Sequence, residues 1–223
     1  MKREIRGIIC LFLAMLMAAS CSDNSKMKGL LEQVPADADV VLVGSVKTVL
    51  ESAGGKSSLL SFIFGLRNDY NGEILFDGTD IRTISVPQWC DIRTRTISML
   101  PQDMGLFPEL TVAQNIELKN NRTGHKSGVQ IEELLERLGI AGKRDVAVGK
   151  LSIGQMQRVA LVRAVCQPFD FIFLDEPVSH LDARNNRIVA DIVGEEADRQ
   201  GAGIIATSVG NHLLLDNAQF ISL

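Results

Sequence analysis

Runs of apolar residues alternate with polar turns along the chain and predict a series of buried strands. The runs at 40–43 (VVLV), 171–174 (FIFL) and 203–207 (GIIAT) have the length and composition of such strands. We expect the run at 203–207 to be the last strand. A further apolar stretch, ISML at 97–100, ends directly before Pro101.

Other segments have the spacing of helices. The segment 46–55 (VKTVLESAGG) is expected to be a helix ended by Gly54. In EELLERLGI, the side chains of Leu134, Leu135 and Leu138 lie on one helical face. That helix suits either a helical subdomain or a plain core.

The composition is that of one folded domain, with or without an appendage. The chain has 223 residues, of which 46% are hydrophobic and 22% charged, so it can bury a core and is too apolar to be disordered. Its 23 Lys and Arg against 27 Asp and Glu give a formal net charge of -4. The basic footprint of a nucleic-acid-binding protein is absent, and we expect no nucleic-acid partner.

Cysteine and histidine positions predict neither a disulfide framework nor a zinc site. The four cysteines are far apart and form no C-x-x-C pair. Cys90 and Cys166 are expected to be small core residues. The histidines, His125, His180 and His212, lack the spacing of metal ligands.

The N-terminus has the layout of a secretory signal. Basic residues within the first six positions precede an apolar run at 8–17, which small residues connect to Cys21. The ending Ala-Ala-Ser-Cys resembles a bacterial lipoprotein signal, which implies that residues 1–21 are a signal peptide and that Cys21 is lipidated. A buried N-terminal helix or a misassigned start codon is the alternative.

A second resemblance follows the signal. Residues 22–55, which include VPADADVVLVGSVKTVLESAGG, resemble the N-terminus of a Bacteroides-type lipoprotein. A lipidated chain of that kind is anchored in a membrane outside the cytoplasm, in the periplasm or at the outer membrane. Within it, GSVKT imitates a phosphate-binding loop, but Val46 stands where the loop requires glycine, so we treat this motif as a decoy.

Four blocks in the rest of the chain point to phosphate chemistry. GKSS at 55–58 opens an apolar helix, where backbone N–H groups and the helix dipole attract phosphate. LPQ at 100–102 ends an apolar stretch, and LSIGQ at 151–155 opens another helix. The strand at 171–174 leads into Asp175-Glu176, a carboxylate for a metal and a second one that can polarise water.

In this order and spacing, the blocks resemble the ATP-binding cassette (ABC) ATPase, the motor subunit of ABC transporters, over residues 56–223. The resemblance implies an α/β fold of the P-loop NTPase kind, with a mostly parallel sheet and a helical subdomain. The opening antiparallel strands of the family are not recognisable. We therefore expect the N-terminal β-subdomain to be missing or replaced, with Val40–Val43 filling the strand before the P-loop. The expected domains are 1–21, 22–55 and 56–223.

The resemblance also implies which residues bind the nucleotide. ATP would be bound by the P-loop residues Gly54, Gly55, Lys56, Ser57 and Ser58. In this family the signature motif completes the site of the opposing subunit, so hydrolysis needs a head-to-tail dimer. Here that motif would consist of Ser152, Gly154 and Gln155.

Catalysis would fall to the remaining motifs. Mg²⁺ would be held by Ser57, Gln102 and Asp175, with Glu176 as the catalytic base. Gln102 would also sense the γ-phosphate and couple the site to a membrane permease. Residues 179–182 would be the D-loop, and a transporter motor of this kind works on the cytoplasmic face of the membrane.

The sequence departs from the family pattern in several places. Leu50 stands where the P-loop begins with glycine. Between residues 22 and 50 there is no Phe, Tyr or Trp to stack on adenine, a contact worth about 1–3 kcal/mol per base in nucleic-acid complexes. Ile153 replaces a signature glycine. Ser208 stands where a switch histidine is expected, one helical turn before His212. These departures predict weakened ATP binding and slow or absent hydrolysis.

Three interpretations stay open because an ABC motor needs cytoplasmic ATP whereas a lipidated Cys21 lies outside. The chain is a working ABC ATPase, or an exported, membrane-anchored lipoprotein with an inert ATPase-like body, or a hybrid of two reading frames joined near residue 55. Even for a hybrid, the encoded chemistry is that of an ABC ATPase, and that is the function expected.

Overall fold

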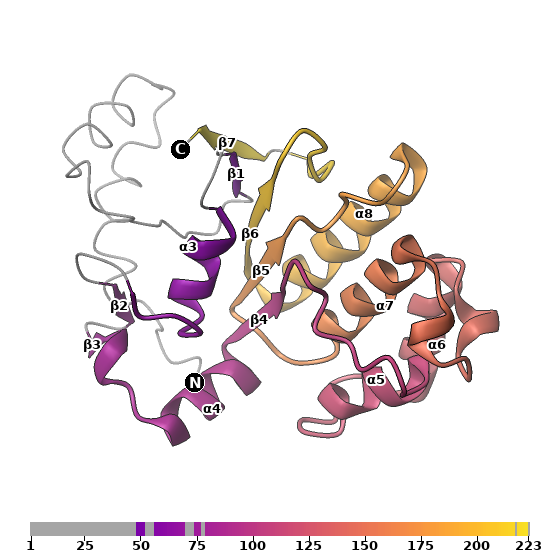
Figure 1. The fold of residues 1–223 in the computed structure, drawn as a ribbon, viewed down its shortest axis with the longest axis horizontal. Coiled ribbons are helices and arrows are strands. Elements are labelled where there is room, and N and C mark those ends of the chain that lie inside the picture. Colours follow the sequence, from indigo (N-terminus) through magenta and orange to yellow (C-terminus); the bar gives the residue numbers. More distant parts are fainter. Residues whose placement is uncertain (1–47, 52–55, 70–73, 77–78, 217, 223) are drawn as a thin grey trace.

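A five-stranded parallel sheet forms the centre of the fold. The computed structural model describes residues 48–51, 56–69, 74–76, 79–216 and 218–222. Within them the strand order is β4-β5-β6-β1-β7 (Figure 1). The strands are β1 (Thr48–Glu51), β4 (Ile97–Leu100), β5 (Phe171–Asp175), β6 (Gly203–Ser208) and β7 (Gln219–Ser222). A separate antiparallel pair consists of β2 (Leu75–Phe76) and β3 (Thr79–Asp80).

Helices cover both faces of this sheet (Figure 1). One face packs against α3 (Lys56–Ile63) and α4 (Val86–Arg95), the other against α7 (Ile153–Val165) and α8 (Ala183–Gln200). Two more helices, α5 (Val112–Asn120) and α6 (Gly128–Arg137), pack against α7. In the described part of the chain, short 3₁₀ turns occupy Ile81–Thr83, Ala141–Lys143 and Val148–Lys150. The α/β class with a parallel sheet, expected from the sequence, is confirmed.

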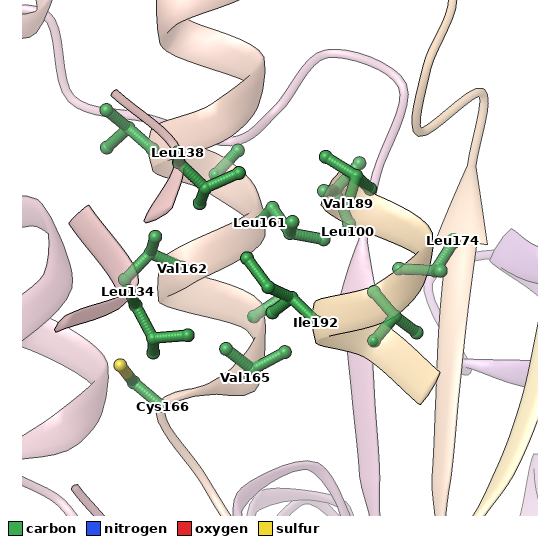
Figure 2. Close-up of a cluster of buried hydrophobic side chains, with 14 of the residues drawn as sticks. Leu100, Leu134, Leu138, Leu161, Val162, Val165, Cys166, Leu174, Val189 and Ile192 are labelled. Atoms are coloured by element: carbon green, nitrogen blue, oxygen red, sulfur yellow. The ribbon is translucent and has the colours of Figure 1, made fainter. Parts of the chain in front are cut away.

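Successive side chains of a strand point to opposite faces of the sheet, which divides the core into two clusters. Ile172 and Leu174 of β5 point toward α7 and α8, whereas Phe173 packs on the opposite face with side chains of α3 and α4. In Figure 2, Leu161 of α7 and Ile192 of α8 meet side chains of β4 and β5 in the larger cluster. Burying each such side chain stabilises the fold by about 1.5–3 kcal/mol.

Two expectations about the strands are wrong. The helix expected over 46–55 is contradicted at Thr48–Glu51, which form β1 and pair with β6 on one side and β7 on the other. Pairing on both edges outweighs the weak helical pattern. The run at 203–207 is not the last strand, since β7 follows it in the chain and pairs with β1. No periodic signal marks β7, because QFIS is too short.

Two further expectations need correction. The strand directly before residues 52–55 is β1 and not Val40–Val43, which lie outside the described residues. Cys166 is buried as expected, but Cys90 is exposed. Cys90 directly follows Trp89, the buried residue of α4. Because one step along a helix turns a side chain by about 100°, Cys90 points away from the face that Trp89 buries.

Candidate functional site

The parallel strands bring the ends of distant segments to one edge of the sheet. β1 pairs with β6, which pairs with β5, so their carboxyl ends lie side by side. β5 ends at Asp175, and only four residues lie between the end of β1 at Glu51 and the start of α3 at Lys56. The backbone therefore places the first turn of α3, Lys56, Ser57 and Ser58, at the edge that carries Asp175. Leu50 lies inside β1, and Gly54 and Gly55 lie outside the described residues.

The two acids at this edge have different backbone conformations. Asp175 is still part of β5 and only 2% exposed. Glu176 leaves the strand with φ 54°, in the left-handed region that residues other than glycine seldom adopt. Asp175 is therefore buried within the strand, whereas Glu176, beyond its end, is partly exposed.

Thr207, the residue of β6 that pairs with Asp175, holds both acids. Its Oγ1 donates a hydrogen bond of 2.6 Å to Oδ1 of Asp175. Its carbonyl accepts a hydrogen bond of 3.0 Å from the amide of Glu176. Sequence reasoning missed Thr207, although a polar residue at the carboxyl end of a buried strand next to an acid-bearing strand is a usable signal.

Gln102 reaches the same edge from the other side of β5. It lies two residues beyond the end of β4, and β4 pairs with β5 in parallel register. Its side chain is exposed. The following turn includes Met104 with φ 63° and Gly105, whose carbonyl accepts a hydrogen bond from the guanidinium of Arg163.

Ser208 and His212 form a pair at the end of β6. The Ser208 hydroxyl and Nδ1 of His212 are 2.7 Å apart. The amide Nδ2 of Asn186 donates to the His212 carbonyl at 2.7 Å and fixes the turn that carries the imidazole. The residues between Ser208 and His212 form a bend, not a helix, which is how the histidine reaches back to Ser208.

Ser152 and Gln155 cap the helix that they begin. The Gln155 amide donates to Oγ of Ser152 at 3.3 Å, and the Ser152 amide donates to Oε1 of Gln155 at 3.0 Å. Ile153, between them, is 50% exposed. Gly154 lies so close to the segment after β5 that an added Cβ would be 3.0 Å from the carbonyl oxygen of His180.

The segment 179–182 leads from β5 into α8. Asp182 is the N-cap of α8 and accepts a hydrogen bond of 2.8 Å from the amide of Asn185. That backbone hydrogen bond, helped by the Asn185 side chain, holds the pKa of Asp182 below its usual range. Ser179 and His180 are exposed at the surface of the molecule.

The described residues offer no stand-alone metal centre, since no three His, Cys, Asp or Glu among them come together. A Mg²⁺ ion that accompanies a nucleotide takes only one or two carboxylates from the protein. Within the same residues, no helix is both long and apolar enough to cross a bilayer. The predicted signal peptide and Cys21 lie outside the described residues and stay predictions.

Comparison with known proteins identifies similar chains. The family model described as ABC transporter matches residues 32–179, and so begins ahead of residue 56. An ABC transporter ATP-binding protein of Mycobacterium tuberculosis is 33% identical over 171 residues, 75% of this chain and 52% of its own length. The chain thus spans about half the length of that relative.

Two other relatives are named for import. The Fe(3+) ions import ATP-binding protein FbpC 1 of Haemophilus influenzae is 35% identical over 71% of this chain and 48% of its own length. The thiamine import ATP-binding protein ThiQ of a Ruegeria species is 33% identical over 77% of this chain and 73% of its own length.

Solved structures share the fold. A dimeric bacterial ABC transporter cassette superposes with a TM-score of 0.69 at 22% identity, over 82% of this chain and 84% of that one. A post-hydrolysis dimer bound to ADP and Pi superposes with a TM-score of 0.66 at 24% identity, over 75% of this chain and 77% of that one.

Proposed function

This chain belongs to the ABC transporter family, and from that premise we propose that it binds and hydrolyses ATP as the motor subunit of a transporter. One observation carries the proposal. The sheet brings Asp175 and Glu176 to the edge where α3 begins with Lys56. A triphosphate at the start of α3 would lie beside a buried carboxylate and a second acid.

The start of α3 suits phosphate. The first amides of a helix have no partner within the helix, and the helix dipole favours negative charge there. The ammonium group of Lys56 would bind the β- and γ-phosphates, and the hydroxyls of Ser57 and Ser58 belong to the same turn. Gly54 and Gly55 would let the preceding backbone approach the phosphates.

The donor set at Asp175 fits Mg²⁺. Among the described residues, the hydrogen-bond partner of this buried carboxylate is the uncharged hydroxyl of Thr207, which does not balance its charge. A divalent cation would do so. Ser57, Gln102 and Asp175 would hold the ion, which when bound neutralises charge on the phosphate oxygens. Glu176, which leaves β5 next to it, would orient and deprotonate the attacking water.

The partners follow from the same proposal. Ser152, Gly154 and Gln155 would complete the site of a second copy in a head-to-tail dimer, and a membrane permease would receive the motion through the exposed Gln102 turn. Relatives named for thiamine and Fe(3+) import favour an import system. The chain would then work at the cytoplasmic face of the membrane.

Calorimetry with Mg-ATP and a phosphate-release assay test the function. Lys56→Ala is expected to lower ATP affinity at least tenfold, and Glu176→Gln to keep affinity while lowering kcat by roughly 10²–10⁴-fold. Lys143→Ala, which removes an exposed lysine from a 3₁₀ turn, serves as the matched control and should behave like the unchanged chain. If Lys56→Ala binds ATP as tightly as the unchanged chain, the proposal is wrong.

A second candidate rests on the segment that ends in Cys21. If that cysteine is lipidated, the chain is an exported, membrane-anchored lipoprotein with an inert ATPase-like body. Labelled palmitate that enters the chain, and is lost in Cys21→Ser, would establish this candidate, and absence of label would remove it. Continuous DNA reads across codons 52–60 would remove a hybrid that arose by sequence assembly.

A further inference from the structure

Gln157 is a buried polar residue in the first turns of α7, and its side chain contacts the segment that follows β5. The residue is 2% exposed. Its Nε2 donates to the carbonyl of Glu176 at 2.7 Å and to Oγ of Ser179 at 3.2 Å. Its Oε1 accepts a hydrogen bond of 3.2 Å from the amide of His180. One amide side chain thus holds three residues of the turn.

The contacted carbonyl belongs to a backbone that needs support. Glu176 has φ 54°, a conformation that costs free energy in a residue with a Cβ and persists only when its surroundings impose it. Its carbonyl also accepts hydrogen bonds from the amide of Ser179 at 3.3 Å and from its hydroxyl at 3.1 Å. The donor of Gln157 makes the shortest of these contacts.

The start of α7 also packs closely against the same turn. The carbonyl oxygen of His180 lies 3.0 Å from where a Cβ on Gly154 would be, so the two backbones touch with no room for a side chain. Glycine at this position permits the approach, and Gln157, one turn further along, adds the hydrogen bonds. The beginning of α7 and residues 176–180 are therefore held as one unit.

We propose that Gln157 is a positioning residue that fixes the carboxylate of Glu176 through its backbone carbonyl and ties the base to the start of α7. The inference rests on the proposed ATP hydrolysis. A displacement of Glu176 by about 1 Å would leave the nucleotide bound but misplace the attacking water, and such errors cost up to about 10²-fold in rate. Loss of this contact should therefore change kcat and spare KM.

Gln157→Glu in the full-length chain tests the proposal. A carboxylate keeps the size of the side chain and the acceptor for the His180 amide, but it sets an oxygen against the Glu176 carbonyl in place of a donor. We expect kcat for ATP to fall about 10- to 100-fold with KM within twofold. As the pH is lowered, the protonated carboxyl can donate to the carbonyl again, so kcat relative to the unchanged chain should recover.

Gln167→Glu is the matched control. Gln167 is 1% exposed and donates to two backbone carbonyls, those of Arg93 at 3.1 Å and Ile97 at 3.0 Å, away from Glu176. Gln167→Glu removes the same kind of hydrogen-bond donor as Gln157→Glu, so a purely structural defect should lower the free energy of unfolding in both variants. Only Gln157→Glu should lower kcat. If the kcat of Gln157→Glu stays within twofold of that of the unchanged chain, the proposal is overturned.

Amide hydrogen exchange separates this proposal from the proposed function. If the unchanged chain hydrolyses no ATP, the proposed function fails, but the contact is still measurable. The amide of Ser179, whose acceptor is the Glu176 carbonyl, should lose protection at least tenfold in Gln157→Glu and keep it in Gln167→Glu. Unchanged protection in both variants would refute the positioning role, whatever the activity.

Discussion

At the scale of single residues, the hydrogen bond from Thr207 fixes the position of Asp175. The hydrogen bond between them is short, and both residues are almost completely buried. A buried carboxylate that loses a donor keeps its desolvation cost and loses the compensation. The hydroxyl of Thr207 therefore matters more than the volume of its side chain.

Thr207→Val should lower the free energy of unfolding by about 1–3 kcal/mol, although it keeps the shape of the side chain. It should also weaken Mg-ATP binding, since the carboxylate is free to rotate. Thr207→Ser keeps the hydroxyl and loses one methyl group, worth about 0.8 kcal/mol. Urea unfolding and calorimetry compare the two, and a valine variant that binds Mg-ATP as well as the serine variant would contradict this role.

Single residues also show what the sequence could predict. Asp175 and Glu176 were predictable because an apolar run ends at them. Thr207 and Gln157 were not, since each acts on a residue far away in the chain and no local periodicity encodes such a contact. Cys90 was misjudged for a related reason, because burial depends on which face of α4 meets the sheet.

A buried ion pair joins the segment before α6 to α8. Nζ of Lys126 lies 2.6 Å from Oε2 of Glu196, and the two side chains are 2% and 5% exposed. Arg199, whose side chain is 55% exposed, contacts the other oxygen of Glu196 at 2.7 Å. At the scale of elements, this pair fixes the α5–α6 region against the long helix beside the sheet.

Lys126→Met should cost about 3–5 kcal/mol of unfolding free energy, because it leaves a buried carboxylate with one partly exposed partner. Lys126→Met combined with Glu196→Met should recover much of that loss, since two apolar side chains need no compensation. Arg137→Met breaks the exposed pair with Glu195 and should cost at most about 1 kcal/mol. Denaturant unfolding measures all three, and a double variant no more stable than Lys126→Met would contradict the pairing.

The helices were more predictable than the strands. α6 and α7 begin at S-x-x-Q capping boxes and carry clear apolar faces, so their starts follow from local chemistry. β1 is a four-residue strand whose pattern also suits a helix, and its pairing with β6 and β7 decides between them. Strand order follows from such long-range pairing, which no window of sequence contains.

At the scale of the whole molecule, the proposed mechanism requires a second copy of the chain. Ile153 is half-exposed at the first position of α7. In a head-to-tail dimer it would face the triphosphate bound by the partner. Ile153→Glu should leave the fold intact, because an acid at a helix N-terminus is favourable by about 0.3–1 kcal/mol, yet it should block hydrolysis by repelling phosphate.

Mixing two inactive chains distinguishes a shared site from a site within one chain. Lys56→Ala damages the α3 half and Ile153→Glu the α7 half, so a mixed dimer contains one site with both defects and one with neither. Equal amounts should restore about a quarter of the sites, because about half of the dimers are mixed and each has one intact site. A phosphate-release assay that shows no recovery, although each variant is folded and associates, would place both halves in the same chain and remove the dimer from the mechanism.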